Sequence, residues 1–457
     1  MDRGRLDAAT LERQIADDEV DTVVVAFTDL QGRLVGKRVT GHFFADRVLA
    51  AGVEACNYLL AVDVDMTPLP GYRFANWEQG YGDVRCRPDL ATLRAVPWLE
   101  KTALVLCDLV DADDEPIEVS PRQVLRRQVE RAAALGFRVM CGSELEFYLF
   151  RDSYEEARVK GYADLTYHAP YVQDYHVLQT TRDEYVIRAI RNGMDAAGVP
   201  VEFSKGEAGP GQHEINLEYA DALEMADRHV IYKNGAKEIA GLHGRSVTFM
   251  AKYAIDQCGS SCHIHSSLWD RAGQQPLGWE PEQPGNWAPA FRHWVGGLVH
   301  HTRELAWLFA PTINSYKRYQ HESWAPTALA WGLDNRTCGF RVVGHSPASL
   351  RVESRVPGAD CNPYLAFAAT VAAGLHGLEH EEDPGAAFTG NAYEADDVAR
   401  VPSTIVEAIA ELEDSKLAVD AFGDEVHQHL VNTARQEWAA FGGVVTDWER
   451  RRCFEQF

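Results

Sequence analysis

The sequence predicts a two-domain α+β protein, with a small β-rich domain over residues 1–115 and a larger α/β domain over residues 116–457. The chain of 457 residues is about two to three times as long as a usual single domain. Before residue 115 the periodic segments are of the β type, whereas after it helical segments alternate with short β-type segments. Hydrophobic residues make up 46% of the chain and charged residues 25%, a globular composition.

The first domain is expected to begin with a β-hairpin. Residues 22–27 (TVVVAF) are rich in β-branched side chains, residues 29–32 supply a turn, and residues 34–39 return antiparallel. Residues 102–110 (TALVLCDLV) are a further apolar strand, followed by an acidic turn. We therefore expect the sheet of this domain to contain these three strands.

Helices of the larger domain are marked by their first residues. Ser120 and Asn362 are each followed by proline, which favours the first position of a helix. The first of these helices is expected to stop at Gly136. The expected helices cover residues 121–135, 221–240 and 362–378.

The charge balance excludes several classes of partner. The chain has 44 Lys and Arg residues against 68 Asp and Glu residues, giving a formal net charge of −24. Such an acidic protein repels phosphate backbones and anionic membranes, so no nucleic acid and no membrane partner is expected. An anionic substrate must instead meet a local group of arginines and lysines inside a site.

The expected location is the cytoplasm. Nine cysteines are scattered without a CxxC pair, which is typical of reduced thiols. Residues 1–20 are charged and lack the apolar centre of a signal peptide, and the longest apolar stretch, residues 364–378, is shorter than a membrane span. The run EHEEDP at residues 379–384 is interpreted as a solvated loop.

Three short β-type segments of the larger domain carry charged or metal-binding side chains two residues apart. Residues i and i+2 of a strand point to the same face, so each segment presents a polar face towards something that the protein encloses. A glycine-rich loop at residues 205–214 adds two more carboxylates. The residues of these four segments are Glu144 and Glu146, His263 and His265, Arg351, Glu353 and Arg355, and Glu207 and Glu214.

Each pattern alone has an ordinary interpretation: an exposed sheet face, a packed pair of histidines, or a surface ladder of ion pairs. Together, at least five carboxylates and a histidine match the ligands of Mg²⁺ or Mn²⁺, and without cations they would repel one another. Nearby arginines then suit a phosphoryl group and a substrate carboxylate. Residues 32–38 do not have the spacing of a P-loop. The residues therefore predict a two-metal enzyme that handles ATP or phosphate.

Six motifs follow one another in a fixed order along the chain. They are SELEF at 143–147, GEAGPGQHE at 206–214, GSSCHIH at 259–265, PTINSYKR at 311–318, NRTCGFR at 335–341 and RVESRVPGADCNPYLAFAA at 351–369. In these motifs the chain resembles the type I glutamine synthetase superfamily over nearly its whole length. The resemblance implies an N-terminal β-grasp-like domain and a catalytic barrel-like α/β domain. It also implies a homo-oligomer, a dodecamer of two hexameric rings with active sites between neighbouring subunits.

The same resemblance implies a role for each matching residue. Two metal ions per active site, Mg²⁺ or Mn²⁺, would be held by Glu146, Glu207 and Glu214 and by Glu144, His263 and Glu353. Glutamate would contact Gly259, His263, Arg318 and Arg355, and the transferred phosphoryl group would contact Arg336 and Arg341. ATP, the co-substrate, would lie against Glu202, Tyr219, His265, Ser267 and Arg351. Arg318 and Arg336 are the expected catalytic arginines, because a guanidinium binds carboxylate and phosphate through two parallel hydrogen bonds.

The expected amine site departs from the family. In glutamine synthetases, an aspartate of the neighbouring subunit and a glutamate of a flap hold ammonium. Here the flap reads HESWAP at residues 321–326, with Trp324 at the position of the glutamate, and Cys56 aligns with the aspartate. The alternative is a shift of register that lets Glu322 replace the glutamate. His321 and Glu322 are the candidate bases for deprotonating the amine.

The resemblance implies an ATP-dependent ligase that phosphorylates the γ-carboxylate of glutamate, and the departures predict that it couples this group to a small primary amine. An uncharged pocket with an indole suits a short monoamine, with ethanolamine the expected one, better than a polyamine. The chain is accordingly similar to glutamine-synthetase-like enzymes that make γ-glutamylamides. A γ-glutamylpolyamine ligase, an ordinary glutamine synthetase and a non-catalytic structural or regulatory relative remain the alternatives.

Overall fold

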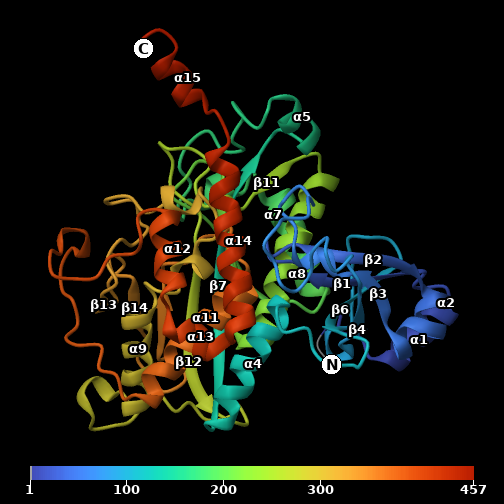
Figure 1. Cartoon of the computed structure of the whole chain (residues 1–457), viewed down its shortest axis with the longest axis horizontal. Coiled ribbons are helices and arrows are strands. Elements are labelled where there is room, and N and C mark those ends of the chain that lie inside the picture. Colours follow the sequence, from blue (N-terminus) through green and yellow to red (C-terminus); the bar gives the residue numbers. More distant parts are fainter. Residues whose placement is uncertain (1–2) are drawn as a thin grey trace.

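Two β-sheets organise the chain, one on either side of residues 111–120. A computed structural model describes residues 3–457, and Figure 1 shows the first sheet (blue) beside a larger part in which helices surround the second sheet. The α+β class predicted from the sequence is confirmed. The connection between the sheets contains residue 115, although the domain boundary itself stays a prediction.

The first sheet contains the predicted hairpin. Strands β1 and β2 pair antiparallel with Thr22 opposite Thr40, and β6, the predicted strand at 102–110, lies parallel to β1. The strand order is β2-β1-β6-β4-β3, with β5 paired to β6. The elements are α1 (Ala8–Ala16), β1 (Thr22–Thr28), β2 (Leu34–Thr40), α2 (Gly41–Phe43), α3 (Leu49–Ala51), β3 (Val53–Cys56), β4 (Asp83–Pro88), β5 (Arg94–Ala95) and β6 (Thr102–Val110).

The second sheet is built around the long strand β7, which pairs with both β9 and β12. The strand order is β13-β14-β15-β12-β7-β9-β8, with β10 and β11 also paired to β7. Its strands are β7 (Phe137–Phe150), β8 (Val201–Gly206), β9 (Gln212–Leu217), β10 (Ala220–Asp221), β11 (Ser246–Thr248), β12 (Cys262–Asp270), β13 (Trp331–Leu333), β14 (Phe340–Val343) and β15 (Arg351–Ser354). The segment expected as a glycine-rich loop is in fact part of the β8–β9 hairpin. Only residues 207–211 lie outside the paired strands.

Helices pack against the apolar face of the second sheet. Helices α4 and α8 contact β7, and α11 packs against both of them. The predicted starts are confirmed: α4 begins at Pro121 after Ser120, and α11 begins at Pro363 with the Asn362 side chain accepting the Tyr364 N–H. The helices are α4 (Pro121–Ala134), α5 (Tyr154–Val159), α6 (Val177–Thr180), α7 (Glu184–Ala196), α8 (Ala222–Leu242), α9 (Pro289–His301), α10 (Ala306–Phe309), α11 (Pro363–Glu379), α12 (Ile405–Glu413), α13 (Lys416–Phe422), α14 (Asp424–Gly442) and α15 (Asp447–Cys453).

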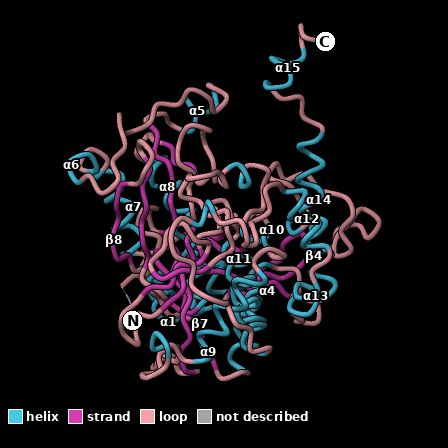
Figure 2. The backbone as a smooth tube through the Cα atoms, turned by 90° about the vertical axis from the view of Figure 1, so that its left-hand side faces the viewer, coloured by secondary structure: helices cyan, strands magenta, loops and turns pink. Residues whose placement is uncertain are grey.

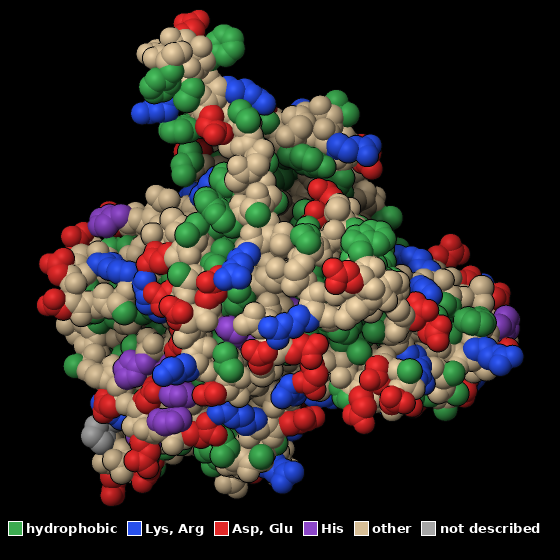
Figure 3. Space-filling view, in the orientation of Figure 1, with side chains coloured by type: hydrophobic (Ala, Val, Ile, Leu, Met, Phe, Trp, Pro, Cys, Tyr) green, Lys and Arg blue, Asp and Glu red, His purple; other side chains and the backbone are tan. Residues whose placement is uncertain are grey.

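The C-terminal helix α15 projects from the rest of the molecule in two perpendicular views (Figures 1 and 2). Its side chains and those of the last residues are exposed, including Trp448, Phe454 and Phe457. On the molecular face in Figure 3, acidic and basic side chains are interspersed. None of the helices in the described part of the chain combines the length and the apolar character needed to cross a lipid bilayer.

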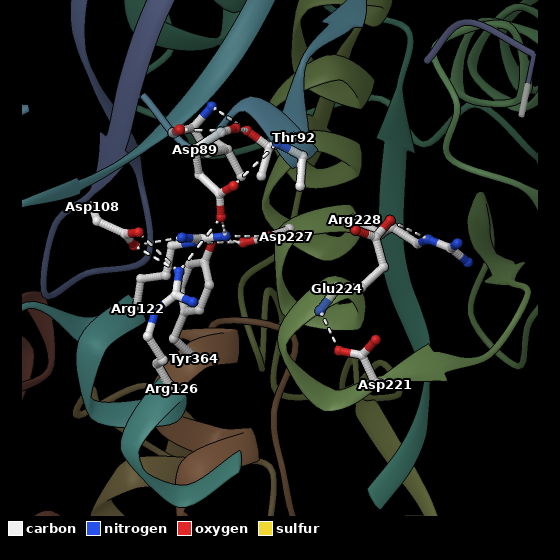
Figure 4. Close-up of polar contacts among 12 residues, drawn as sticks. Asp89, Thr92, Asp108, Arg122, Arg126, Asp221, Glu224, Asp227, Arg228 and Tyr364 are labelled. Carbon is white, nitrogen blue, oxygen red and sulfur yellow. Dashed lines mark hydrogen bonds and ion pairs between the residues drawn. The ribbon is translucent and has the colours of Figure 1, made fainter. Parts of the chain in front are cut away.

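A buried arginine joins the two sheets. Figure 4 shows the Arg122 guanidinium, on α4, between carboxylates of both parts of the chain. It donates to Asp227 of α8 with two bonds of 2.9 Å, to Asp89 at 2.8 Å and to Asp108 of β6 at 2.5 Å. Tyr364 of α11 donates to Asp227 at 2.6 Å. Removing one partner of such a buried group leaves an uncompensated charge, so this network fixes how the first sheet sits on α4, α8 and α11.

Candidate active site

The register of the second sheet brings the predicted polar residues together. Directly opposed residues of antiparallel strands have Cβ atoms about 4.5–5.5 Å apart, so their side chains meet on one face. These pairs lie on the face of the second sheet that is opposite the helices. They come from five neighbouring strands, β9, β7, β12, β15 and β14. The opposed pairs are Glu144 with His263, Glu144 with Asn216, Glu146 with Glu214, His265 with Glu353, and Arg341 with Glu353.

One carboxylate cluster lies over β7, β8 and β9. Oxygen atoms of Glu146, Glu207 and Glu214 lie within 4.8 Å of one another. They line a cavity of about 480 Å³. One oxygen of Glu146 accepts the backbone N–H of Ser261 at 2.8 Å, and Lys205 forms an ion pair with Glu207. The remaining oxygen atoms face the cavity and are free to ligate a hard cation.

Burial and mutual repulsion disfavour the ionised form of this cluster. Burial, with the charge of Glu207, raises the pKa of Glu146 to about 8. Burial, with the charges of Glu144 and Glu207, also raises the pKa of Glu214 well above its ordinary value. A divalent cation among the three carboxylates offsets the free-energy cost of burying their charges and the cost of their mutual repulsion, because each carboxylate is attracted to the cation. The residues therefore fit a Mg²⁺ or Mn²⁺ ion.

A second cluster contains Glu144, His263 and Glu353. Nδ1 of His263 lies 3.2 Å from Glu144 and 3.4 Å from Glu353, and its buried Nε2 has no partner among the described residues. Burial, with the positive charge of Arg355, lowers the pKa of His263 to about 4, so the ring is neutral and able to ligate a metal. His265 lies 2.9 Å from the other oxygen of Glu144. Ligand atoms in this region lie within 4.8 Å of one another in two combinations, Glu144 with Glu214 and His263, and Glu144 with His265 and Glu353. These side chains together can therefore supply the donors of a divalent cation.

Metal binding at the first cluster is expected to release protons. In the metal-free protein Glu146 has a pKa of about 8, so at pH 7 most molecules hold a proton that a cation displaces. Because the folded chain binds this proton more tightly than the unfolded chain, the metal-free fold loses stability as the pH rises from 4.5 through about 8. Calorimetric titration with Mg²⁺ at pH 7, in buffers of different ionisation enthalpy, should show release of about one proton or more per chain. Equal heats in all buffers would contradict this expectation.

Arginines line the same cavity, but they differ in how free they are to bind a substrate. Arg318 is buried, and its two Nη atoms already donate to the carbonyls of Val356 and Arg355 and to the Ser261 hydroxyl at 2.8–2.9 Å. Its Nε is the donor left without a partner in the described chain. A Cβ at Gly259 would meet Arg318 Cγ at 2.6 Å, so glycine is required for this packing. Arg318 thus stabilises the cavity wall through these hydrogen bonds and also lines the cavity.

The other arginines face the carboxylates. Arg355 donates to Glu353 at 2.7 Å, Arg341 pairs with the other oxygen of Glu353, and both arginines line the cavity. Burial would raise the pKa of Glu353, but Arg355 and His263 lower it to about 2. Arg336 is half-exposed and lies 3.8 Å from Asp334. Its guanidinium is therefore the one of these three with the weakest protein contact, and it is available to an anionic ligand.

A second cavity, of about 260 Å³, adjoins the first. All five residues expected at ATP line it, and Glu144 and Asn216 line both cavities. Arg351 donates to His265 at 3.2 Å, and the ring of Tyr219 stacks beside that of Trp269 with centroids 6.3 Å apart. A ligand that extends from one cavity to the other must therefore pass Glu144. The five residues are Glu202, Tyr219, His265, Ser267 and Arg351.

The flap closes one side of the larger cavity. Trp324 lines it, and its carbonyl accepts a hydrogen bond from Arg355 at 3.3 Å, while Tyr393 donates to the carbonyl of Ala325 at 2.8 Å. The described residues that line the cavity include neither His321, Glu322 nor Cys56. The first of these pairs with Glu394 on the surface, and the thiol lies at the end of β3 near the Tyr81 carbonyl. Their expected roles at the amine stay predictions.

Among the residues of the larger cavity that the sequence analysis did not select are Lys205 and Asn216. Lys205 lies between Glu207 and Asp174 with its Nζ over the ring of Tyr175, and Asn216 stands between the two cavities. Both continue an alternation already present in the sequence, because Lys205 is two residues before Glu207 and Asn216 two residues after Glu214. Extending the same-face rule by one step would have found them.

Comparisons with known proteins agree with this architecture. Residues 118–453 match the glutamine synthetase catalytic domain family. The chain belongs to the glutamine synthetase family, and the resemblance inferred from the six motifs is confirmed. It is 52% identical to a γ-glutamylethanolamide synthetase of Streptomyces coelicolor, over 98% of this chain and 95% of that protein. It is 37% identical to a glutamate–isopropylamine ligase of Pseudomonas sp, over 96% of both chains. A solved structure of GmaS in complex with ADP superposes with a TM-score of 0.84 at 28% identity, over 97% of this chain and 99% of that one.

Proposed function

We propose that the chain is an ATP-dependent ligase that phosphorylates the γ-carboxylate of glutamate and couples it to a small primary amine, with ethanolamine preferred. The observation that carries the proposal is the junction of the two cavities at Glu144. It connects the expected nucleotide cavity to the cavity that holds both carboxylate clusters and the arginines. The relatives named above, a synthetase and a ligase that differ in their amines, support the same class of reaction.

We propose two divalent cations, Mg²⁺ or Mn²⁺, at this junction. Glu146, Glu207 and Glu214 would hold one ion, and Glu144, His263 and Glu353 would hold the other. When bound, such ions neutralise the charge that develops on a transferred phosphoryl group. Their arrival would also end the pairing of Lys205 with Glu207 and of the arginines with Glu353. Arg341 and Arg355 would then be free to contact anionic substrates.

The chain's own residues would orient the two substrates. Arg336, exposed at the cavity, and Arg341 would contact the phosphoryl oxygens through planar two-pronged hydrogen bonds. Gly259, Arg355 and Nε of Arg318 would contact glutamate, since these positions surround the same cavity. The flap, held by Arg355 and Tyr393, would exclude water from the γ-glutamyl phosphate until the amine attacks and phosphate leaves.

The amine would bind beside Trp324. An ammonium ion gains little charge stabilisation from an indole, whereas a two-carbon amine buries its methylenes at about 0.8 kcal/mol for each CH₂. Two methylenes therefore favour ethanolamine over ammonium by about 1.6 kcal/mol, or more than about tenfold, before its hydroxyl forms any hydrogen bond. A polyamine carries further ammonium groups that need carboxylates. The expected order is therefore ethanolamine first, with ammonium and polyamines poor.

Amine-dependent phosphate release tests this order. With ATP and glutamate fixed, kcat/KM is measured for ethanolamine, isopropylamine, ammonium, putrescine and spermine. We expect ethanolamine to exceed ammonium by at least about tenfold. If ammonium equals ethanolamine, the chain is a glutamine synthetase; if putrescine or spermine leads, it is a polyamine ligase. The absence of phosphate release with every amine would favour a non-catalytic relative.

We further propose a cytoplasmic homo-oligomer, a dodecamer of two hexameric rings. The projecting C-terminal segment supports assembly, because the side chains of Trp448, Phe454 and Phe457 are 66%, 86% and 94% exposed in the single chain. The position of Cys56 outside its own chain's cavity agrees with a contribution to a neighbouring subunit. All nine cysteines are free, which suits a reducing compartment. Light scattering on the purified protein should give the mass of about twelve chains; a monomer would contradict the proposal.

A further inference from the structure

Histidines gather at one end of the second part of the chain, away from both cavities. His300 and His301 end helix α9, and His376 lies in the last turn of α11. Figure 3 shows histidine side chains collected over α9. None of these three residues is among those that line the two cavities of the candidate active site. The cluster therefore needs an explanation of its own.

The carboxylate of Glu382 lies at the centre of this cluster. Its Oε1 is 2.9 Å from Nε2 of His301 and 3.0 Å from Nδ1 of His376, while its Oε2 is 3.3 Å from Nδ1 of His300. One ligand atom from each of His301, His376 and Glu382 lies within 4.8 Å of the others. A tetrahedral Zn²⁺ with bonds of about 2.0–2.2 Å separates its ligand atoms by about 3.3 Å. The two nitrogen–oxygen separations therefore need to increase by only a few tenths of an ångström to match those of a Zn²⁺ site.

A second carboxylate orients the central histidine. Nδ1 of His301 lies 2.6 Å from Glu304, and the other oxygen of Glu304 accepts a hydrogen bond of 2.6 Å from Ser415. This contact places a ring hydrogen on Nδ1 and leaves Nε2 facing the Glu382 carboxylate at 2.9 Å. In the metal-free protein a second ring proton satisfies this contact, and a metal ion bound here would take the place of that proton. A carboxylate behind the ligating imidazole is the usual support of a metal-bound histidine.

The surroundings also favour a positive charge. The last turns of α9 and α11 converge here, and the carbonyl end of each helix carries a partial negative charge. The run EHEEDP, interpreted from the sequence as a solvated loop, supplies Glu382 together with further acidic side chains. Of these, Glu379 pairs with Arg131 and Asp383 with Arg292, whereas the side-chain partners of the Glu382 carboxylate among the described residues are histidines. The central carboxylate is thus surrounded by imidazoles, which can ligate a metal, rather than by an arginine or a lysine, which cannot.

We propose that His301, His376 and Glu382 bind a divalent transition-metal ion, Zn²⁺, with His300 or water as the fourth ligand. Imidazole nitrogen selects Zn²⁺ over Mg²⁺, so this site differs chemically from the carboxylate clusters of the active site. Bound metal joins the ends of α9 and α11 to the turn at residues 380–385. It therefore stabilises the folded chain, by an amount that rises with the logarithm of the free Zn²⁺ concentration above Kd.

The test is a Zn²⁺ titration of the full-length protein in the presence of Mg²⁺ and a non-hydrolysable ATP analogue, which occupy the active site. We expect the wild type to bind one more Zn²⁺ per chain than the double variant His301→Gln/His376→Gln. The matched control is His243→Gln/His345→Gln, which changes two exposed histidines elsewhere and should keep the extra ion. Zn²⁺ should raise the unfolding temperature of the wild type and the control, and raise that of the double variant less.

A second variant distinguishes loss of the metal site from misfolding of the double variant. Glu382→Gln preserves the size of the side chain and is expected to lose the same Zn²⁺ equivalent. Bound Co²⁺ should give the intense visible absorption of a tetrahedral nitrogen and oxygen site in the wild type and not in either variant. Equal Zn²⁺ stoichiometry in the wild type, Glu382→Gln and the double variant would overturn the proposal.

Discussion

Replacing Glu214 with glutamine is expected to reduce ATP- and amine-dependent phosphate release by about a thousandfold, through loss of a metal ligand worth about 4 kcal/mol. Burial and the charges of Glu144 and Glu207 raise the pKa of Glu214 well above its usual range, which favours the protonated form of this side chain in the metal-free protein. Glutamine resembles that protonated form in size and charge. The metal-free protein should therefore unfold at nearly the same temperature as the wild type, whereas its stabilisation by Mg²⁺ should be much smaller.

The matched control is Glu130→Gln, the same exchange at an exposed position of α4. It should leave phosphate release and the Mg²⁺-induced rise in unfolding temperature unchanged. The measurements are steady-state phosphate release at saturating Mg²⁺ and thermal unfolding with and without Mg²⁺. A Glu214→Gln variant that keeps most of its turnover would show that Glu214 is not a metal ligand.

Exchanging Trp324 for glutamate should reverse the amine preference. The indole is replaced by a carboxylate at the cavity, so ammonium gains an ion pair and ethanolamine loses its apolar contact. We expect the ratio of kcat/KM for ethanolamine to that for ammonium to fall by at least about tenfold. This is the change in affinity that corresponds to the burial of two methylene groups. The exchange leaves the backbone contact of residue 324 with Arg355 in place. Both amines are measured at fixed ATP and glutamate.

Trp324→Gln separates charge from size. It removes the indole without adding a carboxylate, so ethanolamine should weaken while ammonium shows no gain. Residue 324 has a φ of 65°, an unusual conformation for a bulky side chain, and thermal unfolding of both variants checks that the flap exchange does not unfold the protein. If Trp324→Glu and the wild type show the same ratio of the two amines, the indole does not select the amine.

The residues on the polar face of the second sheet could be predicted because they follow from the local alternation of side chains along each strand. Alternation in a strand fixes which side chains share a face, and this rule applies within Glu144–Glu146 and within Arg351–Arg355 without any knowledge of the fold. Which strands lie side by side is not local. The pairing of Glu144 with His263, 119 residues apart, follows from the topology, and only the family resemblance gave an expectation for it.

Other features depend on packing that the sequence pattern does not contain. Arg318 looks like a substrate clamp in its motif, but its Nη atoms are used by main-chain carbonyls and by Ser261. Lys205 follows the alternation that contains Glu207, but its position opposite Glu214 depends on the pairing of β8 with β9. The histidine cluster combines the ends of two helices with the loop at residues 379–384, and no single stretch of sequence reveals that meeting.

The network around Arg122 has a consequence for the order of folding during synthesis. Asp227 lies 105 residues after Arg122, and Tyr364 a further 137 residues after Asp227. At the usual rate of translation, roughly 5–20 residues per second, Asp227 is made roughly 5–20 s after its arginine partner. The N-terminal sheet can pair its strands in that interval, but α8 and α11 do not yet exist for it to dock on. The contact between the two parts therefore forms late, and the hydrogen bond from Tyr364 to Asp227 is added only after α11 has been made.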